Sequence, residues 1–220
     1  MLKKILFGTL MILLALGLVG CGKKLPEAPA DKAVMAYAQL YSYGAADDEN
    51  LKATNLSEAD IEKIREQIFE PIRQDIAKYA FSEETVKALR EKFFDRMKAI
   101  SRITATIAKD DKENPVVELI TPSINKEFST ALAEEDEGFL AFKTTLAELR
   151  AQGLTDEQLK ASPEFQKFAL DSAGEFVSGF TMNERATIHV TCEIVEGSDG
   201  KSYWKPKDEQ AIKNYIMGIK

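Results

Sequence analysis

The side chains most often used for covalent or acid–base chemistry are scarce in this chain of 220 residues. It contains one histidine, His189, and two cysteines, Cys21 and Cys192. Any Ser-His-Asp or Cys-His arrangement would have to use His189, and no Gly-x-Ser-x-Gly motif is present to supply a nucleophile. His189 lies between Thr187 and Thr191 in a segment where polar and apolar residues alternate. We therefore predict a surface histidine on the polar face of a strand, and no catalytic residue.

The sequence also lacks the residue spacing of common metal sites. A zinc site needs three or four Cys, His or carboxylate ligands, usually in close pairs, which one histidine and one available cysteine cannot provide. Residues 47–50 and 110–114 are acidic, but neither has the spacing of an EF-hand calcium loop. We interpret both as solvated loops, and residues 134–137 as an exposed helical junction. We predict no metal and no cofactor, whereas the sequence leaves open paired carboxylates of the type used in glycoside hydrolysis.

Residues 1–20 have the layout of a bacterial secretory signal peptide. Lys3 and Lys4 give a basic start, residues 5–18 are almost entirely apolar, and a small residue lies just before Cys21. An uncleaved transmembrane helix is the alternative, but the apolar run of about 14 residues is shorter than the roughly 20 that cross a bilayer. We therefore predict that residues 1–20 are removed. Residues 21–32, which include two prolines, then form a tether.

The segment Leu18-Val19-Gly20-Cys21 resembles the lipobox of bacterial lipoproteins. The resemblance implies a diacylglyceryl group on the Cys21 sulfur, cleavage before Cys21, and a new amino group that can be acylated. Two acyl chains are enough for stable anchoring, whereas one is not. We expect Cys21 to be lipidated and to hold the protein on the extracytoplasmic face of the cell membrane. Cys192 then has no disulfide partner, and we predict a buried, unreactive thiol.

The composition indicates a folded, acidic protein. Hydrophobic residues make up 45% of the chain and charged residues 30%, which are globular values. The net charge is -7, and it becomes -9 once Lys3 and Lys4 leave with the signal peptide. A negative surface argues against nucleic acid as a partner, because phosphates are bound by Lys and Arg. The expected partners are the membrane, through the lipid, and an unidentified small molecule, peptide or protein.

Hydrophobic periodicity predicts helical blocks that alternate with β-hairpins. Helical spacing occurs over residues 33–43, 57–79, 82–97 and 123–180 and after Asp208, and strand alternation over residues 103–107, 116–121, 186–194 and 201–205. The predicted helix caps are Ser57, Ser82, Thr155, Ser162 and Asp208. Paired strands favour an α+β fold, in which the antiparallel hairpins form one curved sheet packed on helices. We expect a single domain over residues 33–220, and the sequence leaves open whether its two helix–hairpin halves are a repeat.

The C-terminal third carries a second resemblance. A Phe-rich helix at residues 165–180 leads into the Thr-rich strand, which is followed by Lys201-Ser202-Tyr203-Trp204-Lys205 and a helix ending in Met217-Gly218. Together with the lipobox, this order resembles small bacterial lipoproteins grouped as domain of unknown function 5105, over residues 33–220. The strand, tryptophan and helix also resemble cystatin-like and NTF2-like folds, which implies a curved antiparallel sheet around a helix. Neither resemblance implies an activity.

These observations favour a non-enzymatic, membrane-anchored binding module. We expect any ligand cleft to lie between the sheet and the Phe-rich helix, because small-molecule sites are concave and mostly apolar. The alternative is a cell-surface hydrolase that uses carboxylates, or His189 with a nearby hydroxyl. Convergent acids or a serine near His189 would favour the hydrolase, whereas an apolar or filled groove would favour the binding module.

Overall fold

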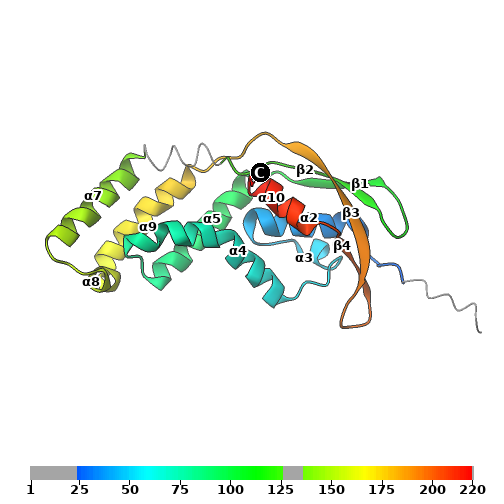
Figure 1. Cartoon of the computed structure of the whole chain (residues 1–220), viewed down its shortest axis with the longest axis horizontal. Coiled ribbons are helices and arrows are strands. Elements are labelled where there is room, and N and C mark those ends of the chain that lie inside the picture. The colour runs from blue at the N-terminus through cyan, green and yellow to red at the C-terminus, as the bar shows by residue number, and fades with distance from the viewer. Residues whose placement is uncertain (1–23, 126–135, 220) are drawn as a thin grey trace, which may run out of the picture.

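The four predicted strands form one antiparallel sheet in the order β1-β2-β3-β4 in the computed structural model, which describes residues 24–125 and 136–219. The strands are β1 (Thr104–Lys109), β2 (Val116–Thr121), β3 (Ala186–Glu196) and β4 (Ser202–Pro206) (Figure 1). Pairing of β2 with β3 joins the two predicted hairpins, and it sets Val117 opposite Val190 and Glu118 opposite His189. The predicted signal peptide, Cys21, and Glu134 and Glu135 of the predicted junction lie outside the described residues.

Helices occupy most of the remaining described chain. They are α2 (Ala30–Tyr43), α3 (Asp48–Leu51), α4 (Glu58–Ile76), the 3-10 turn η1 (Ala77–Tyr79), α5 (Glu83–Ile100), α7 (Glu137–Ala151), α8 (Asp156–Ala161), α9 (Pro163–Ser178) and α10 (Glu209–Ile216). The predicted α+β class, with antiparallel strands between helical blocks, is confirmed.

The five predicted caps each hold the start of a helix. Ser57 Oγ accepts from the Asp60 backbone nitrogen at 3.2 Å, and Asp60 Oδ2 accepts from the Ser57 backbone nitrogen at 3.0 Å, which makes a full capping box. A second reciprocal pair begins α8, at Thr155 and Gln158. The other predicted caps also accept from the backbone nitrogen three residues later: Ser82, Ser162 and Asp208. These bonds satisfy backbone donors that have no partner inside the helix.

Helix α2 covers the inner face of the sheet and packs against β1, β2 and β4. The inward residues of the central strands are buried against it: Val117, Leu119, Val190, Cys192 and Ile194. From α2, Val34, Tyr37 and Leu40 enter the same core. Burial of these apolar faces is the main force holding the helix on the sheet. His189 lies on the opposite, exposed face, as predicted from the alternation.

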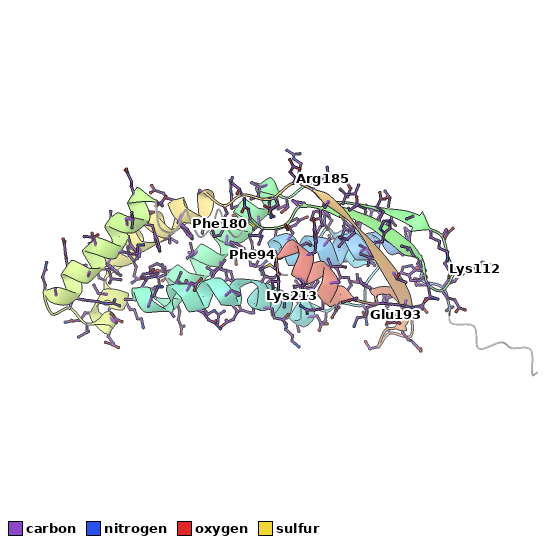
Figure 2. All side chains as sticks on the ribbon, turned by 45° about the horizontal axis from the view of Figure 1, so that its top comes forward. Phe94, Lys112, Phe180, Arg185, Glu193 and Lys213 are labelled. Atoms are coloured by element: carbon purple, nitrogen blue, oxygen red, sulfur yellow. The ribbon has the colours of Figure 1, made fainter. Side chains whose placement is uncertain are left out.

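Helices α4, α5, α7, α8 and α9 form a second region that extends away from the sheet, whereas α3 and α10 pack against α2 (Figure 1). Helix α9 packs along α5 and α7, and α8 packs against α9. Figure 2 shows the two ends of the elongated molecule, with α7 and α8 at one end and Lys112, in the β1–β2 connection, at the other. The Phe-rich helix predicted next to the sheet therefore belongs to the helical region instead.

The tether ends earlier than predicted. Helix α2 begins at Ala30 and not near residue 33, so the described tether comprises only residues 24–29. Trp204 Nε1 donates a hydrogen bond to the Ala28 carbonyl at 2.8 Å, and Ala28 packs against the core. The end of the tether is therefore fixed beside β4, through a contact between residues 176 positions apart in the sequence.

Three further local predictions are wrong. Residues 48–51 form the helical turn α3 and not a loop, because Asn50 is buried and donates to Gln39 Oε1 at 3.0 Å. The second helical block does not begin at residue 123, because Ile124 forms a β-bridge with Met182. Ile107 is 39% exposed although its alternation predicts burial, because β1 is an edge strand whose register shifts after this residue.

Candidate functional site: an apolar pocket among the helices

The structure separates the candidate reactive residues from one another. His189 is exposed on the outer face of the sheet, opposite Glu118 in β2. Cys192 is completely buried on the inner face, and burial raises the pKa of its thiol to about 12, which keeps it protonated and unreactive. In the described ranges, no group of three or more His, Cys, Asp or Glu side chains is arranged to hold a metal ion. Among the described residues, His189 and Cys192 lie on opposite faces of the sheet and do not meet.

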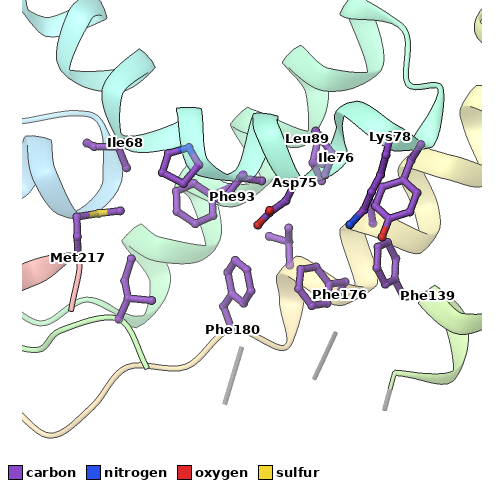
Figure 3. Close-up of a pocket in the computed structure, with 16 residues that line it drawn as sticks. Ile68, Asp75, Ile76, Lys78, Leu89, Phe93, Phe139, Phe176, Phe180 and Met217 are labelled. Atoms are coloured by element: carbon purple, nitrogen blue, oxygen red, sulfur yellow. The ribbon is translucent and has the colours of Figure 1, made fainter. Parts of the chain in front are cut away.

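A pocket of about 510 Å³ opens between the helices of the second region (Figure 3). Its volume lies within the range of about 300–1,000 Å³ typical of small-molecule sites. Helices α4, α5 and α9 supply most of the lining, and the rest comes from η1, α7, Ile124 and Met217. The lining side chains are predominantly apolar, including Ile68, Ile72, Leu89 and Val177. Such a surface binds the apolar part of a ligand by removing it from water.

Five aromatic rings form a continuous wall of this pocket, which we call the aromatic wall: Tyr79, Phe93, Phe139, Phe176 and Phe180. Phe139 stacks on Phe176 with ring centroids 5.2 Å apart, and Phe176 meets Phe180 edge to face at 5.1 Å. Tyr79 and Phe93 extend the wall at its two ends, at 5.5 Å from Phe139 and 5.9 Å from Phe180. These separations match favourable ring geometries, so each ring fixes the orientation of the next.

Two exposed side chains of opposite charge complete the lining. Asp75 belongs to the last turn of α4, and Lys78 to η1. Figure 3 shows both side chains beside the aromatic wall. The Lys78 ammonium group lies 5.1 Å from the centroid of the Tyr79 ring, within the range of a cation–π contact. The site can therefore hold an apolar body against the rings and a polar group at its rim.

Local sequence signals explain how these elements are placed. Ser162 caps α9 and Pro163 occupies its first position, which sets the phase of the helix that carries Phe176 and leads into Phe180. Arg96 of α5 donates to the Phe180 carbonyl at 2.8 and 3.1 Å, and so holds the chain beyond the end of α9. The pocket thus depends on α5 and α9 lying side by side.

The pocket does not lie between the sheet and the Phe-rich helix, where the sequence predicted a ligand cleft. The Phe-rich helix α9 does form a wall, but α4 and α5 stand opposite it, because α2 already covers the inner face of the sheet. Sequence reasoning also missed Phe139, Asp75 and Lys78. The apolar stripe of α7, in which Phe139 is followed by Phe142 and Leu146 with helical spacing, is the signal that could have found the first of these.

Comparisons with known proteins give the fold and no further assignment. The chain is similar to the crystal structure of ycdA from Bacillus subtilis subsp. subtilis str. 168, provisionally named a lipoprotein, with a TM-score of 0.55 and 15% identity. The similarity covers 86% of this chain and 55% of that chain, so our protein spans about half the length of its structural neighbour. No protein-family model matches the chain, and no curated protein matches it significantly. The resemblances to domain of unknown function 5105 and to cystatin-like and NTF2-like folds are therefore not confirmed.

Within the described residues, no helix is long and apolar enough to cross a bilayer.

Proposed function

We propose that this protein is a membrane-anchored bacterial lipoprotein that binds a small amphipathic molecule in the apolar pocket outside the cytoplasm. The observation that carries the binding role is the aromatic wall with Asp75 and Lys78 at its rim. An acyl or aromatic body would lie against the rings, and a polar head would meet the two charged side chains. Because these charges are opposite, a neutral or zwitterionic head suits the rim better than one with a large net charge.

Anchoring rests on the lipobox-like segment ending at Cys21, and the similarity in fold to a protein provisionally named a lipoprotein supports it. Six residues separate Cys21 from Ala28, the point held by Trp204, so the connection spans seven residue-to-residue steps. At about 3.5 Å per residue, a fully extended tether reaches roughly 25 Å at most. In this proposal the sheet stays near the bilayer, and the helical region with its pocket extends away from the tether.

The apolar lining favours the binding module over the alternative hydrolase. The hydrolase would require paired carboxylates in a cleft, or a nucleophilic hydroxyl in a cleft beside His189, and His189 instead lies exposed on the face of a sheet. The hydroxyls that flank it belong to Thr187 and Thr191 on the same strand. Nothing in this arrangement favours hydrolysis, and we propose a non-enzymatic role.

Ligand binding can be tested with a filled pocket and a matched control. Ile72 and Ile61 are half-buried isoleucines on α4, but only Ile72 lines the pocket. The soluble mature chain, residues 22–220, is titrated with the neutral fluorescent probe N-phenyl-1-naphthylamine. Ile72→Trp should weaken probe binding at least tenfold, or by about 1.4 kcal/mol, while Ile61→Trp should leave it within about twofold. Equal affinities for the two variants would rule out the pocket as the binding site.

Anchoring is tested separately. The N-terminal peptide of the protein extracted from membranes should carry a diacylglyceryl group on Cys21, and Cys21→Ser should leave the chain unlipidated with its signal peptide attached. An unmodified Cys21, or cleavage at another position, would contradict the lipoprotein assignment without affecting the result for the pocket.

A further inference from the structure

Two tyrosines of α2 have hydroxyl groups with no hydrogen-bond partner in the described part of the chain. Tyr37 and Tyr41 are 2% and 5% exposed, and their rings lie one helical turn apart with centroids separated by 6.3 Å. The two rings contact each other, and the charge of Glu209 acts on both phenols at longer range. Burial raises the pKa of Tyr41 to about 12 and that of Tyr37 further, so both hydroxyls stay protonated. Buried tyrosine hydroxyls normally have a partner. Neither of these hydroxyls is among the fully buried side-chain atoms of the described residues that lack one, so both remain open to solvent where the two side chains line a second pocket.

Both tyrosines line a second pocket, which lies between α2, α4, α10 and the β3–β4 hairpin. Its volume is about 370 Å³, enough for several water molecules at about 30 Å³ each and within the range of small-molecule sites. In contrast to the first pocket, its lining is mainly polar. The amides of Asn55 and Gln67 join the two hydroxyls, and each of these four groups can both donate and accept a hydrogen bond.

The charged groups of this second pocket already compensate one another. Two carboxylates, Asp60 and Glu209, are matched by Lys63 and Lys205. Hydrogen bonds from Ser57, followed by the charge of Lys63, lower the pKa of Asp60. The Lys205 ammonium nitrogen lies 4.0 Å from Glu209 Oε2. No uncompensated charge faces the pocket, so the site does not select an ion.

We propose that this second pocket binds a small neutral polyhydroxylated molecule of about the size of a monosaccharide, with the Tyr37 and Tyr41 hydroxyls as hydrogen-bonding anchors. Sugar hydroxyls both donate and accept hydrogen bonds, as the phenols and amides of the lining do. The apolar side chains of Leu56, Ile64 and Val195 line the same pocket and can contact the C–H faces of a sugar ring. This site is distinct from the apolar pocket, and its assignment does not depend on the function proposed there.

The experiment uses the full lipidated chain in detergent and measures binding of glucose, galactose, N-acetylglucosamine and myo-inositol by NMR. Glycine and inorganic phosphate serve as charged comparators. Tyr37→Phe and Tyr41→Phe remove only the hydroxyls and should leave the thermal midpoint unchanged, because neither hydroxyl has a partner to lose. For at least one of the neutral probes, each variant should raise the dissociation constant by about 2- to 12-fold, the value of one hydrogen bond.

Tyr203→Phe is the matched control, because this tyrosine donates to Asp199 on the β3–β4 turn and does not line the second pocket. It should leave sugar binding unchanged. The proposal is overturned if no neutral probe binds, if glycine or phosphate competes as well as the sugars, or if Tyr203→Phe weakens binding as much as the α2 variants. A crystal structure grown with the tightest neutral probe that contains ordered water only at Tyr37 and Tyr41 would also overturn it. Ile72→Trp should leave sugar binding intact, which distinguishes failure here from failure of the apolar pocket.

Discussion

Val190→Asp is expected to abolish folding at neutral pH, because Val190 lies at the centre of the core between sheet and α2. It is 6% exposed, pairs with Val117 of β2, and shares the inner face with Cys192. Loss of the buried valine side chain lowers the free energy of unfolding by about 1.5–3 kcal/mol. Holding an ionised carboxylate there corresponds to a pKa shift of up to about 3–5 units, or roughly 4–7 kcal/mol as an upper bound. Together these approach the whole stability of a typical domain, about 5–15 kcal/mol.

The charge makes the effect dependent on pH. Burial raises the folded-state pKa of the introduced carboxyl above its unfolded value of about 3.9. The electrostatic penalty is therefore absent below about pH 4 and grows as pH rises toward the folded-state pKa. Asparagine has nearly the same shape as aspartate and carries no charge. The Val190→Asn variant should therefore lose a similar amount of stability at pH 4 and at pH 7.

The assay is urea unfolding followed by circular dichroism at pH 4 and pH 7 for the wild type and both variants. The aspartate variant should recover stability relative to the asparagine variant at pH 4. A Val190→Asp protein that unfolds at pH 7 with the wild-type midpoint would refute the placement of Val190 in the core. If Val190→Asp lost as much stability at pH 4 as at pH 7, the electrostatic part of the reasoning would be refuted.

Four further results are expected. His189→Ala should change the free energy of unfolding by no more than about 0.5 kcal/mol, because the side chain is exposed. A larger loss in urea unfolding would show that His189 is structural. Loss of a measured activity in a folded variant would favour the hydrolase over the binding module. Ser57→Ala removes the cap of α4 and should destabilise the protein by about 0.5–2 kcal/mol, whereas Ser198→Ala on the exposed turn should not; equal midpoints for the two variants would contradict the role of the cap. Burial raises the pKa of Cys192 and of Tyr41 to about 12, so neither group lowers the free energy of unfolding below its unfolded-state pKa, near 8.5 for Cys192 and near 10 for Tyr41. Between its unfolded and folded pKa, each group should lower the free energy of unfolding by about 1.4 kcal/mol per pH unit. A urea midpoint that stays constant from pH 8 to pH 11 would count against their burial. Thermal melts with and without a strong chelator should overlay, since we propose no metal site, and a lower midpoint with chelator would reveal one.

Local features of the fold were predictable because each depends on residues close together in the chain. Helix starts at Ser57 and Ser162 follow from short cap motifs, and the strand around Val190 follows from its alternation. The prediction failed where distant segments decide the outcome. The hydrogen bond from Trp204 to Ala28 fixes the tether, and burial of Asn50 against Gln39 turns an acidic loop into α3.

The sites were less predictable than the elements, for the same reason. The Phe-rich stripe of α9 indicated an apolar surface, but periodicity does not say which element faces it. The opposite wall comes from α4 and α5, because α2 occupies the inner face of the sheet. The polar pocket was invisible in the sequence, since Tyr37 and Tyr41 have the spacing of ordinary core residues. Only the packed structure reveals that, among the described residues, their hydroxyls have no hydrogen-bond partner.

The most direct test of the central claim is native mass spectrometry of the lipidated protein purified from its own membranes. The wild-type protein should be a diacylated chain that carries a small amphipathic molecule. The molecule should be lost in Ile72→Trp and retained in Ile61→Trp, with the lipid on Cys21 present in all three proteins. A bound molecule that persists equally in both variants, or a wild-type protein that carries none, would contradict the assignment of the apolar pocket as the functional site.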